Sequence, residues 1–457
     1  MIFRESKNSI TALVFFGVLV FFIAFVNIFR LSFNSFFILT LGIAVFLIAL
    51  LKIDFALVIL IFSMLLSPEF QVGLVKGRAI VVRIDDLVLM LVLLGWLARM
   101  ALYKEIGLLK FTALNRPILI YFVICLISTL WGNLRGYGKL QISIFYLLKY
   151  LEYFLLYFMV VNNLRNITQV KVFVFSLLFV ALIVSIYACV RHFQGMERVT
   201  APFEGKAGEA NTLGAYLILI ILIATSFVLN TNSSRARIFS LLILLFALPA
   251  FIFTLSRGSW FAFVPAFIML VIFTPRGKTL LIIVGLSTIV FSSLIFPRYF
   301  YERIDSTFRG GKEYNFLGKR IPLEESAATR VEILKLSFEK LKEEPILGHG
   351  VGTSMPIIDS QYARLLIDVG LLGSLVFVWM LFTIFINSFR NLKKLILDNF
   401  SVCLITGFLA GFVGLVIHGL GAETFIIIRV MEPFWFLAAI ITMLPEICPQ
   451  GSLEANV

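Results

Sequence analysis

Long, continuous apolar runs are the feature that most constrains this chain. Of its 457 residues, 60% are hydrophobic and only 14% are charged. A soluble fold could not bury that much apolar surface, so the surroundings must be a lipid bilayer. Inside a bilayer the backbone must satisfy its own hydrogen bonds, and continuous rather than alternating runs indicate helices rather than barrel strands. The sequence therefore predicts an all-α, polytopic integral membrane protein.

The spacing of the runs predicts the domain organisation. A membrane span needs roughly 20 apolar residues, which gives about 12–14 transmembrane helices. Residues 1–296 are expected to hold the first eleven, 297–362 a long polar loop, and 363–457 the last three and a cytoplasmic tail. A weak excess of Lys and Arg favours a cytoplasmic N-terminus. The long loop then lies outside the cytoplasmic membrane, together with three short regions: 191–210, 256–258 and 419–422.

The long loop has internal order of its own. In "ESAATRVEILKLSFEKLKEEP" the apolar residues fall on one face of an amphipathic helix, which Pro345 ends. "ILGHGVG" follows at 346–352, and its three glycines allow a tight turn around His349. We call this segment the glycine turn. Polar residues then crowd the entrance of the next span, where Arg364 faces Asp368 at i,i+4.

Arginines gather where the predicted outer loops meet the bilayer. Arg257 in "FTLSRGSW" separates two apolar runs. It is either an interfacial anchor or a guanidinium that grips phosphate. Arg191 and Arg198 occupy the loop before Asn211. They are either solvated or a second cationic contact for the same anion. The net charge of +13 is compatible with anionic lipid as well as an anionic substrate.

Other polar residues in the spans have structural explanations. Lys149 with Glu152, and Arg429 with Glu432, have i,i+3 spacing and are expected to neutralise each other. His418 at a span end is expected to be a satisfied interfacial histidine. The cysteines lack metal-ligand spacing, and no phosphate-binding glycine loop or carboxylate clamp appears, so neither metal nor cofactor is expected.

Four stretches together resemble a known family. They are "APFEGKAGEANTLGAYL", "SRGSW", "TRVEILKLSFEKLKEEPILGHGVGTS" and "DSQYARLLIDVGLLGSLVFVWML". Their order and spacing, from about 195 to 445, resemble the O-antigen ligase and polymerase superfamily of bacterial inner-membrane glycosyltransferases.

The resemblance implies a chemistry and roles for residues. Such proteins take a glycan carried on undecaprenyl pyrophosphate, in the periplasm, and transfer it to an acceptor hydroxyl. Membrane lipids and a chain-length regulator are the further partners expected, and nucleic acid is not. Pyrophosphate contacts would come from Arg257 with Arg191 or Arg198. Asp359 and His349 would orient or deprotonate the hydroxyl. The glycan contacts would be Arg330, Tyr362 and Arg364.

One departure separates the alternatives within this superfamily. Ligases usually carry a His-Asn pair where this chain has Asp359 and Ser360. An aspartate there resembles the polymerases of O-antigen or exopolysaccharide repeat units, so polymerisation is the favoured expectation and ligation to lipid A–core or protein the alternative. Asp359 could also merely cap a helix N-terminus. A lipid-linked glycan transporter is the alternative from another class, although the paired, broken spans typical of transporters do not stand out.

Overall fold

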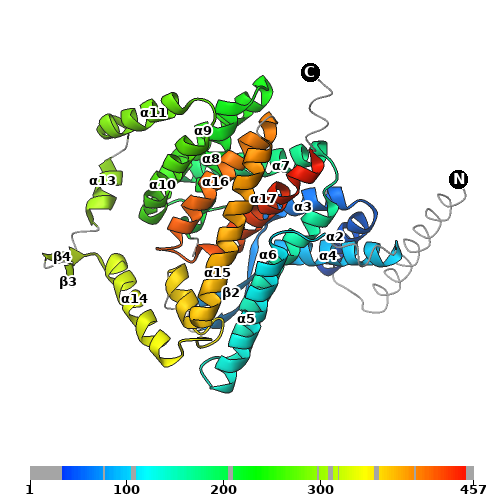
Figure 1. The fold of residues 1–457 in the computed structure, drawn as a ribbon, viewed down its shortest axis with the longest axis horizontal. Helices are drawn as coiled ribbons and strands as arrows, with labels where there is room; N and C mark the ends of the chain where they lie inside the picture. Colours follow the sequence, from blue (N-terminus) through cyan, green and yellow to red (C-terminus); the bar gives the residue numbers. More distant parts are fainter. Residues whose placement is uncertain are drawn as a thin grey trace, which may run out of the picture.

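The structure is a computed structural model, predominantly helical, with the helices packed as a membrane bundle (Figure 1). It describes residues 33–75, 78–103, 110–203, 209–295, 298–306, 312–316, 319–354, 360–395 and 398–448. The predicted first span and Asp359 lie outside the described residues.

Eight helices among the described residues are long and apolar enough to cross a bilayer. They are α5 (Asn115–Leu134), α6 (Leu140–Asn163), α7 (Ile167–Phe193), α8 (Ala210–Asn230), α9 (Ser234–Phe253), α15 (Gln361–Lys394), α16 (Asn399–His418) and α17 (Ile428–Ile447). Shorter or more charged helices accompany them: α2 (Phe33–Leu51), α3 (Ile53–Leu66), α4 (Ile84–Leu102), α10 (Arg257–Phe273) and α11 (Lys278–Val290). The prediction of an all-α polytopic membrane protein is confirmed.

Two short antiparallel hairpins were not predicted from the sequence. β1 (Glu69–Val75) pairs with β2 (Arg78–Arg83) between α3 and α4. β3 (Lys312–Phe316) pairs with β4 (Lys319–Leu323) inside the long insertion. Both lie in connections between helices, where a search for apolar runs finds no signal, and neither changes the fold class.

The rest of the long insertion forms an arm along one side of the bundle (Figure 1). After the short helix α12 (Ser292–Ile295), the insertion starts with α13 (Arg298–Asp305) and continues through the β3–β4 hairpin to α14 (Glu325–Glu343). Helix α14 coincides with the predicted amphipathic helix.

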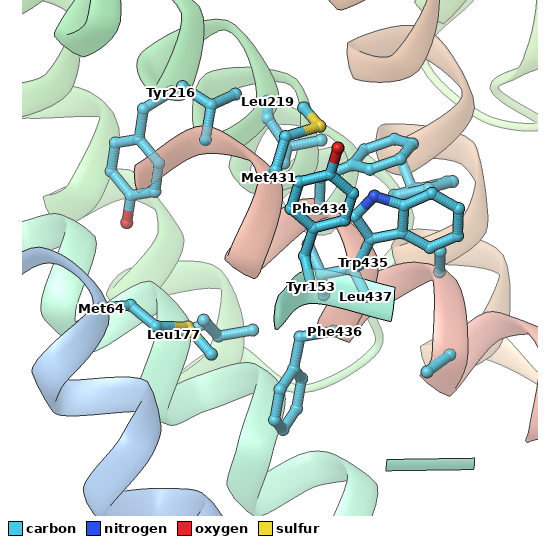
Figure 2. Packing of buried hydrophobic residues seen from close by; sticks show 14 of the residues in the cluster. Met64, Tyr153, Leu177, Tyr216, Leu219, Met431, Phe434, Trp435, Phe436 and Leu437 are labelled. Atoms are coloured by element: carbon cyan, nitrogen blue, oxygen red, sulfur yellow. The ribbon is translucent and has the colours of Figure 1, made fainter. Parts of the chain in front are cut away.

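The core of the bundle lies around α8, α16 and α17. About four-fifths of the apolar stretch of each is buried, against 28% for the peripheral α9. Tyr153 of α6 stacks on Trp435 of α17, with ring centroids 6.0 Å apart, and Phe434 packs beside them (Figure 2). A Cβ atom on Gly407 of α16 would lie only 2.4 Å from the Cα atom of Ile223 in α8. A small residue there lets the two backbones approach closely, as in many membrane helix pairs.

Helix α15 is broken at Gly370, and the glycine turn fills the break. Gly370 has φ 61° and ψ −163°, a conformation that other residues rarely adopt. The N–H groups of His349 and Gly350 donate to carbonyls of α15 before the break, at 2.8 and 2.9 Å. Those of Leu371 and Leu372 donate back to the loop at 2.9 and 3.2 Å. The turn thus satisfies backbone groups that a bilayer could not.

Candidate functional site

Arg257 links the bundle to the arm. It is the first residue of α10, whose N-cap Ser256 accepts a hydrogen bond from the N–H of Ser259. The Arg257 guanidinium donates to the carboxylate of Glu324, just before α14. Arg303 of α13 lies 3.5 Å from the other oxygen of that carboxylate. Both guanidinium groups therefore converge on one anion, which here is a side chain of the chain itself.

Arg198 lies close to the same point. Its guanidinium donates to the carbonyl of Thr254 and to the side chain of Asn211, both at 3.1 Å. Burial lowers the pKa of Arg198 from its ordinary value, and the positive charges of Arg303 and Arg257 lower it further. Several guanidinium groups thus share one region at this end of the bundle, which favours an anionic ligand.

We refer to Arg198, Arg257, Arg303 and Arg330 as the arginine cluster. Arg330 of α14 belongs to it because its positive charge also lowers the pKa of Arg198. Its guanidinium also borders the backbone between α16 and α17: a Cβ atom on Gly421 would lie 3.8 Å from it. Arg191, by contrast, lies in the last turn of α7 and donates to Gln194, the residue that caps this helix, at 3.1 Å. Of the two loop arginines considered from the sequence, Arg198 is the one placed beside Arg257.

A chain of polar side chains runs inward from the arginine cluster. Ser256 donates to Asn211 at 2.8 Å and lies 2.7 Å from the hydroxyl of Ser259. Ser259 contacts one ring nitrogen of His418 at 3.1 Å, and Thr424 contacts the other at 2.8 Å. His418 is buried with both nitrogens partnered, which confirms the prediction of a satisfied histidine. This polar chain fixes the segment 419–427 relative to α10.

Arg364 forms a second, deeply buried charge centre at the start of α15. It is 1% exposed, and its Nε atom lies 3.3 Å from Asp368, which confirms the predicted i,i+4 pair. Its Nη1 atom lies 3.1 Å from Glu423, and its guanidinium covers the ring of Tyr146 at 4.7 Å. Because Glu423 precedes Thr424 in the chain, this centre and the polar chain meet at the same short segment.

The Asp368 carboxylate also accepts hydrogen bonds from the glycine turn and the residues that follow it. Its carboxylate accepts from the N–H groups of Gly352 and Ser354 at 3.0 and 3.1 Å, and lies 3.3 Å from the hydroxyl of Thr353. The buried carboxylate is therefore both paired with Arg364 and fully engaged by the turn. Arg364, Asp368 and the turn form one structural unit.

His349 points away from Asp368 and toward α14. Its Nε2 atom lies 3.1 Å from Glu343, and its ring packs against Tyr137 with centroids 4.6 Å apart. The neighbouring Glu344 accepts from Trp131 and from Tyr137, each at 3.1 Å, and these bonds lower the pKa of Glu344. His349 is only 4% exposed, so it anchors the end of α14 against α5.

Tyr362, the remaining predicted glycan contact, and its neighbour Gln361 lie at the start of α15. Tyr362 donates from its hydroxyl to the carbonyl of Val416 at 2.6 Å. Gln361 accepts from the N–H of Phe425 at 3.0 Å. Both bonds tie the entrance of α15 to the end of α16 and the segment that follows it. Asp359 lies two residues earlier, outside the described residues.

The predicted pairing of Arg429 with Glu432 is wrong. Arg429 donates to Glu69 of the β1–β2 hairpin at 2.9 and 3.2 Å and to the carbonyl of Pro202 at 2.8 Å. Glu432 has its nearest cation in Arg83, at 3.6 Å. The hairpin folds over the start of α17 and supplies partners that helical spacing within α17 could not reveal.

Lys149 makes a cation–π contact with Phe145 of the same helix, in which the ammonium group lies 4.7 Å from the ring centroid.

In the part of the chain that the structure describes, no three His, Cys, Asp or Glu side chains lie together as metal ligands would.

Residues 241–378 match the family model described as O-antigen ligase. This match supports the resemblance to the O-antigen ligase and polymerase superfamily over that part of the chain. No curated protein sequence matches it.

The O-antigen ligase match covers the part of the site on α10, the insertion and the start of α15. Arg257, Arg330, the glycine turn and Arg364 lie within it, whereas Arg198, His418 and Glu423 lie outside. The matching family indicates a function of the O-antigen ligase or polymerase type, with lipid-linked glycans as the implied substrates. The apolar helices indicate a multi-pass membrane protein.

Sequence reasoning missed Glu324, Arg303 and Glu423. Each is a single charged residue in a polar segment, with no spacing that distinguishes it from a solvated side chain. Their roles depend on tertiary contacts with Arg257 and Arg364. A hint was available for Glu324 only, since it directly precedes the amphipathic helix.

Proposed function

We propose that this protein polymerises oligosaccharide repeat units carried on undecaprenyl pyrophosphate, at the periplasmic face of a bacterial inner membrane. The observation that carries the proposal is the convergence of Arg257 and Arg303 on one carboxylate, with Arg198 and Arg330 beside them. Guanidinium groups bind phosphate oxygens in pairs, and such a cluster suits a pyrophosphate.

The reaction is a single displacement at the anomeric carbon. The acceptor hydroxyl forms a new carbon–oxygen bond, and the bond to the lipid pyrophosphate breaks with its electron pair on the departing oxygen. Negative charge therefore grows on the pyrophosphate, where the arginine cluster would stabilise it. Because pyrophosphate is already a good leaving group, this scheme requires no metal ion.

The acceptor side is proposed to begin at Asp359, which would accept the hydroxyl proton. Tyr362 and Arg330, at the rim of the same region, would contact the glycan. His349 and Arg364 enter the proposal as positioning residues, since both side chains are buried among protein partners. They would hold the glycine turn and the entrance of α15 in place.

The polymerase is favoured over the ligase by residues 359–360, where Asp-Ser replaces the His-Asn pair usual in ligases. In this proposal residues 297–362 form one extracytoplasmic loop, residues 1–296 hold the transmembrane helices before it, and residues 363–457 hold those after it. A chain-length regulator is its expected protein partner. Ligation to lipid A–core or protein is the second candidate, because the matching family model is described as a ligase.

Product analysis tests the proposal. The purified protein in liposomes receives lipid-linked repeat units as its only glycan, with and without a chelator. The parent should give a ladder of chain lengths in both conditions, and Arg257→Ala and Asp359→Asn should give none. Arg276→Ala is a matched control, because Arg276, between α10 and α11, donates to Asn232 between α8 and α9, away from the cluster.

Three outcomes would contradict parts of this scheme. A product that forms only after lipid A–core or protein is added would identify a ligase. A ladder that survives Arg257→Ala would leave Arg257 as an interfacial anchor. A ladder lost with the chelator would show that a metal ion takes part.

A further inference from the structure

An open groove of about 570 Å³ lies along α7, between α3 and α9. Its walls are mostly apolar, and phenyl rings make up a large part of them. Phe175 packs against Phe239 with ring centroids 6.0 Å apart, and Phe179 against Phe62 at 6.2 Å. A volume of this size is typical of sites for small ligands.

The groove is remote from the arginine cluster. The far end of α7 reaches that cluster, because His192 stacks on Phe253 and the N–H of Val199, next to Arg198, donates to the carbonyl of Phe253. Phe175 lies 17 residues before His192 on the same helix, which is about 25 Å at 1.5 Å per residue. The groove therefore opens in the other leaflet and belongs to a different site.

A single cation lines the groove at the start of α9. Arg235 is exposed, and within the described part of the chain its guanidinium makes no hydrogen bond or ion pair. Its neighbour Arg237 is also exposed but donates to the carbonyl of Thr231 at 2.6 Å. Arg235 also lies in the first turn of α9, where the helix dipole adds to the attraction for an anion.

We infer that this groove binds an anionic phospholipid, with one acyl chain along the phenyl rings and the headgroup phosphate at Arg235. The apolar walls suit a hydrocarbon chain and the unpartnered guanidinium suits a phosphate, and only an anionic amphiphile offers both. The lipid comes from the leaflet that surrounds the start of α9. This inference is independent of the proposed reaction, which takes place at the other membrane face.

Lipid retention measured by native mass spectrometry tests the site. The full-length protein is incubated with phosphatidylglycerol or with phosphatidylcholine of the same chain length. Three variants accompany the parent: Arg235→Gln removes the cation, Ser176→Phe places a ring in the groove, and Arg237→Gln is the matched control. All must keep the elution profile of the parent.

Phosphatidylglycerol should bind the parent more tightly than phosphatidylcholine, by about fivefold for one basic side chain. Arg235→Gln should abolish that preference, Ser176→Phe should weaken retention of both lipids, and Arg237→Gln should change neither. Equal losses in the two arginine variants would reduce the effect to general surface charge and overturn the inference. Unchanged retention in Ser176→Phe would place the lipid outside the groove and overturn it as well.

Discussion

Replacing Gly370 by alanine should release the glycine turn from α15. A Cβ atom there would lie 2.5 Å from the carbonyl oxygen of Ile346 and 2.7 Å from the nitrogen of Gly348, both backbone atoms that cannot rotate away. The backbone conformation itself costs a non-glycine residue about 1–3 kcal/mol. Four backbone hydrogen bonds across the break are worth about 1 kcal/mol each. The total of about 5–7 kcal/mol is comparable to the whole stability of many domains.

The chain can relieve this strain by letting the turn detach while the helices stay packed. Val351, which is fully buried in the parent, then becomes accessible. The assay is maleimide labelling of Val351→Cys in a background without the four native cysteines, together with thermal unfolding in detergent. Gly370→Ala should raise the labelling rate at least tenfold and lower the melting temperature.

Gly258→Ala is the matched control for this experiment. A Cβ atom on Gly258 meets nothing within 4 Å, and alanine favours the helix that begins there. This control should leave labelling unchanged and stability equal or slightly higher. If Gly370→Ala keeps Val351 protected and melts with the parent, the turn is not held by the break in α15 and the reasoning is refuted.

Three further predictions concern carboxylates that lie outside the membrane-spanning helices. Glu324→Gln removes the anion that competes with substrate for Arg257. A partly exposed ion pair is worth about 1 kcal/mol, so the KM for the lipid-linked donor should fall about fivefold. An unchanged or higher KM would count against pyrophosphate binding at Arg257. Glu344 has a lowered pKa, so its hydrogen bonds stabilise the turn fully at pH values above the ordinary carboxyl pKa of 4.5. This stabilisation is lost as the pH falls through the lowered pKa. The fluorescence of Trp131 should report the loss, and Glu344→Gln should abolish the pH dependence. Glu69→Gln leaves the buried Arg429 without its carboxylate and should cost about 3–5 kcal/mol in unfolding free energy, a loss that a melting curve close to the parent's would disprove.

The sequence predicted what depends on local spacing. The apolar run at 211–229 is α8, and the pair of Arg364 and Asp368 forms as i,i+4 geometry requires. The contact of Arg257 with Glu324 joins residues 67 positions apart, and no periodicity within either segment encodes it. The same holds for Arg429, whose apparent partner within α17 is displaced by Glu69 from a hairpin near the other end of the chain.

The break in α15 shows a second limit. Hydropathy predicts one uninterrupted span from 363 to 388, because Gly370 is apolar enough to pass unnoticed in such a run. The break is stable in a bilayer because the inserted turn supplies hydrogen bonds to the backbone groups that the helix leaves without partners. The role of Asp359 stays a prediction, since it lies outside the described residues.

The pairing of Arg429 with Glu69 has a consequence for how the protein is made. The two residues are 360 positions apart, so Glu69 enters the membrane region long before the ribosome has synthesised its partner. Arg364 has Asp368 four residues away and can insert as a neutral pair, but it too waits for Glu423 to complete its surroundings. A nascent chain that stops before α17 therefore lacks Arg429, and its Glu69 has yet to meet the guanidinium group with which it pairs in the folded protein.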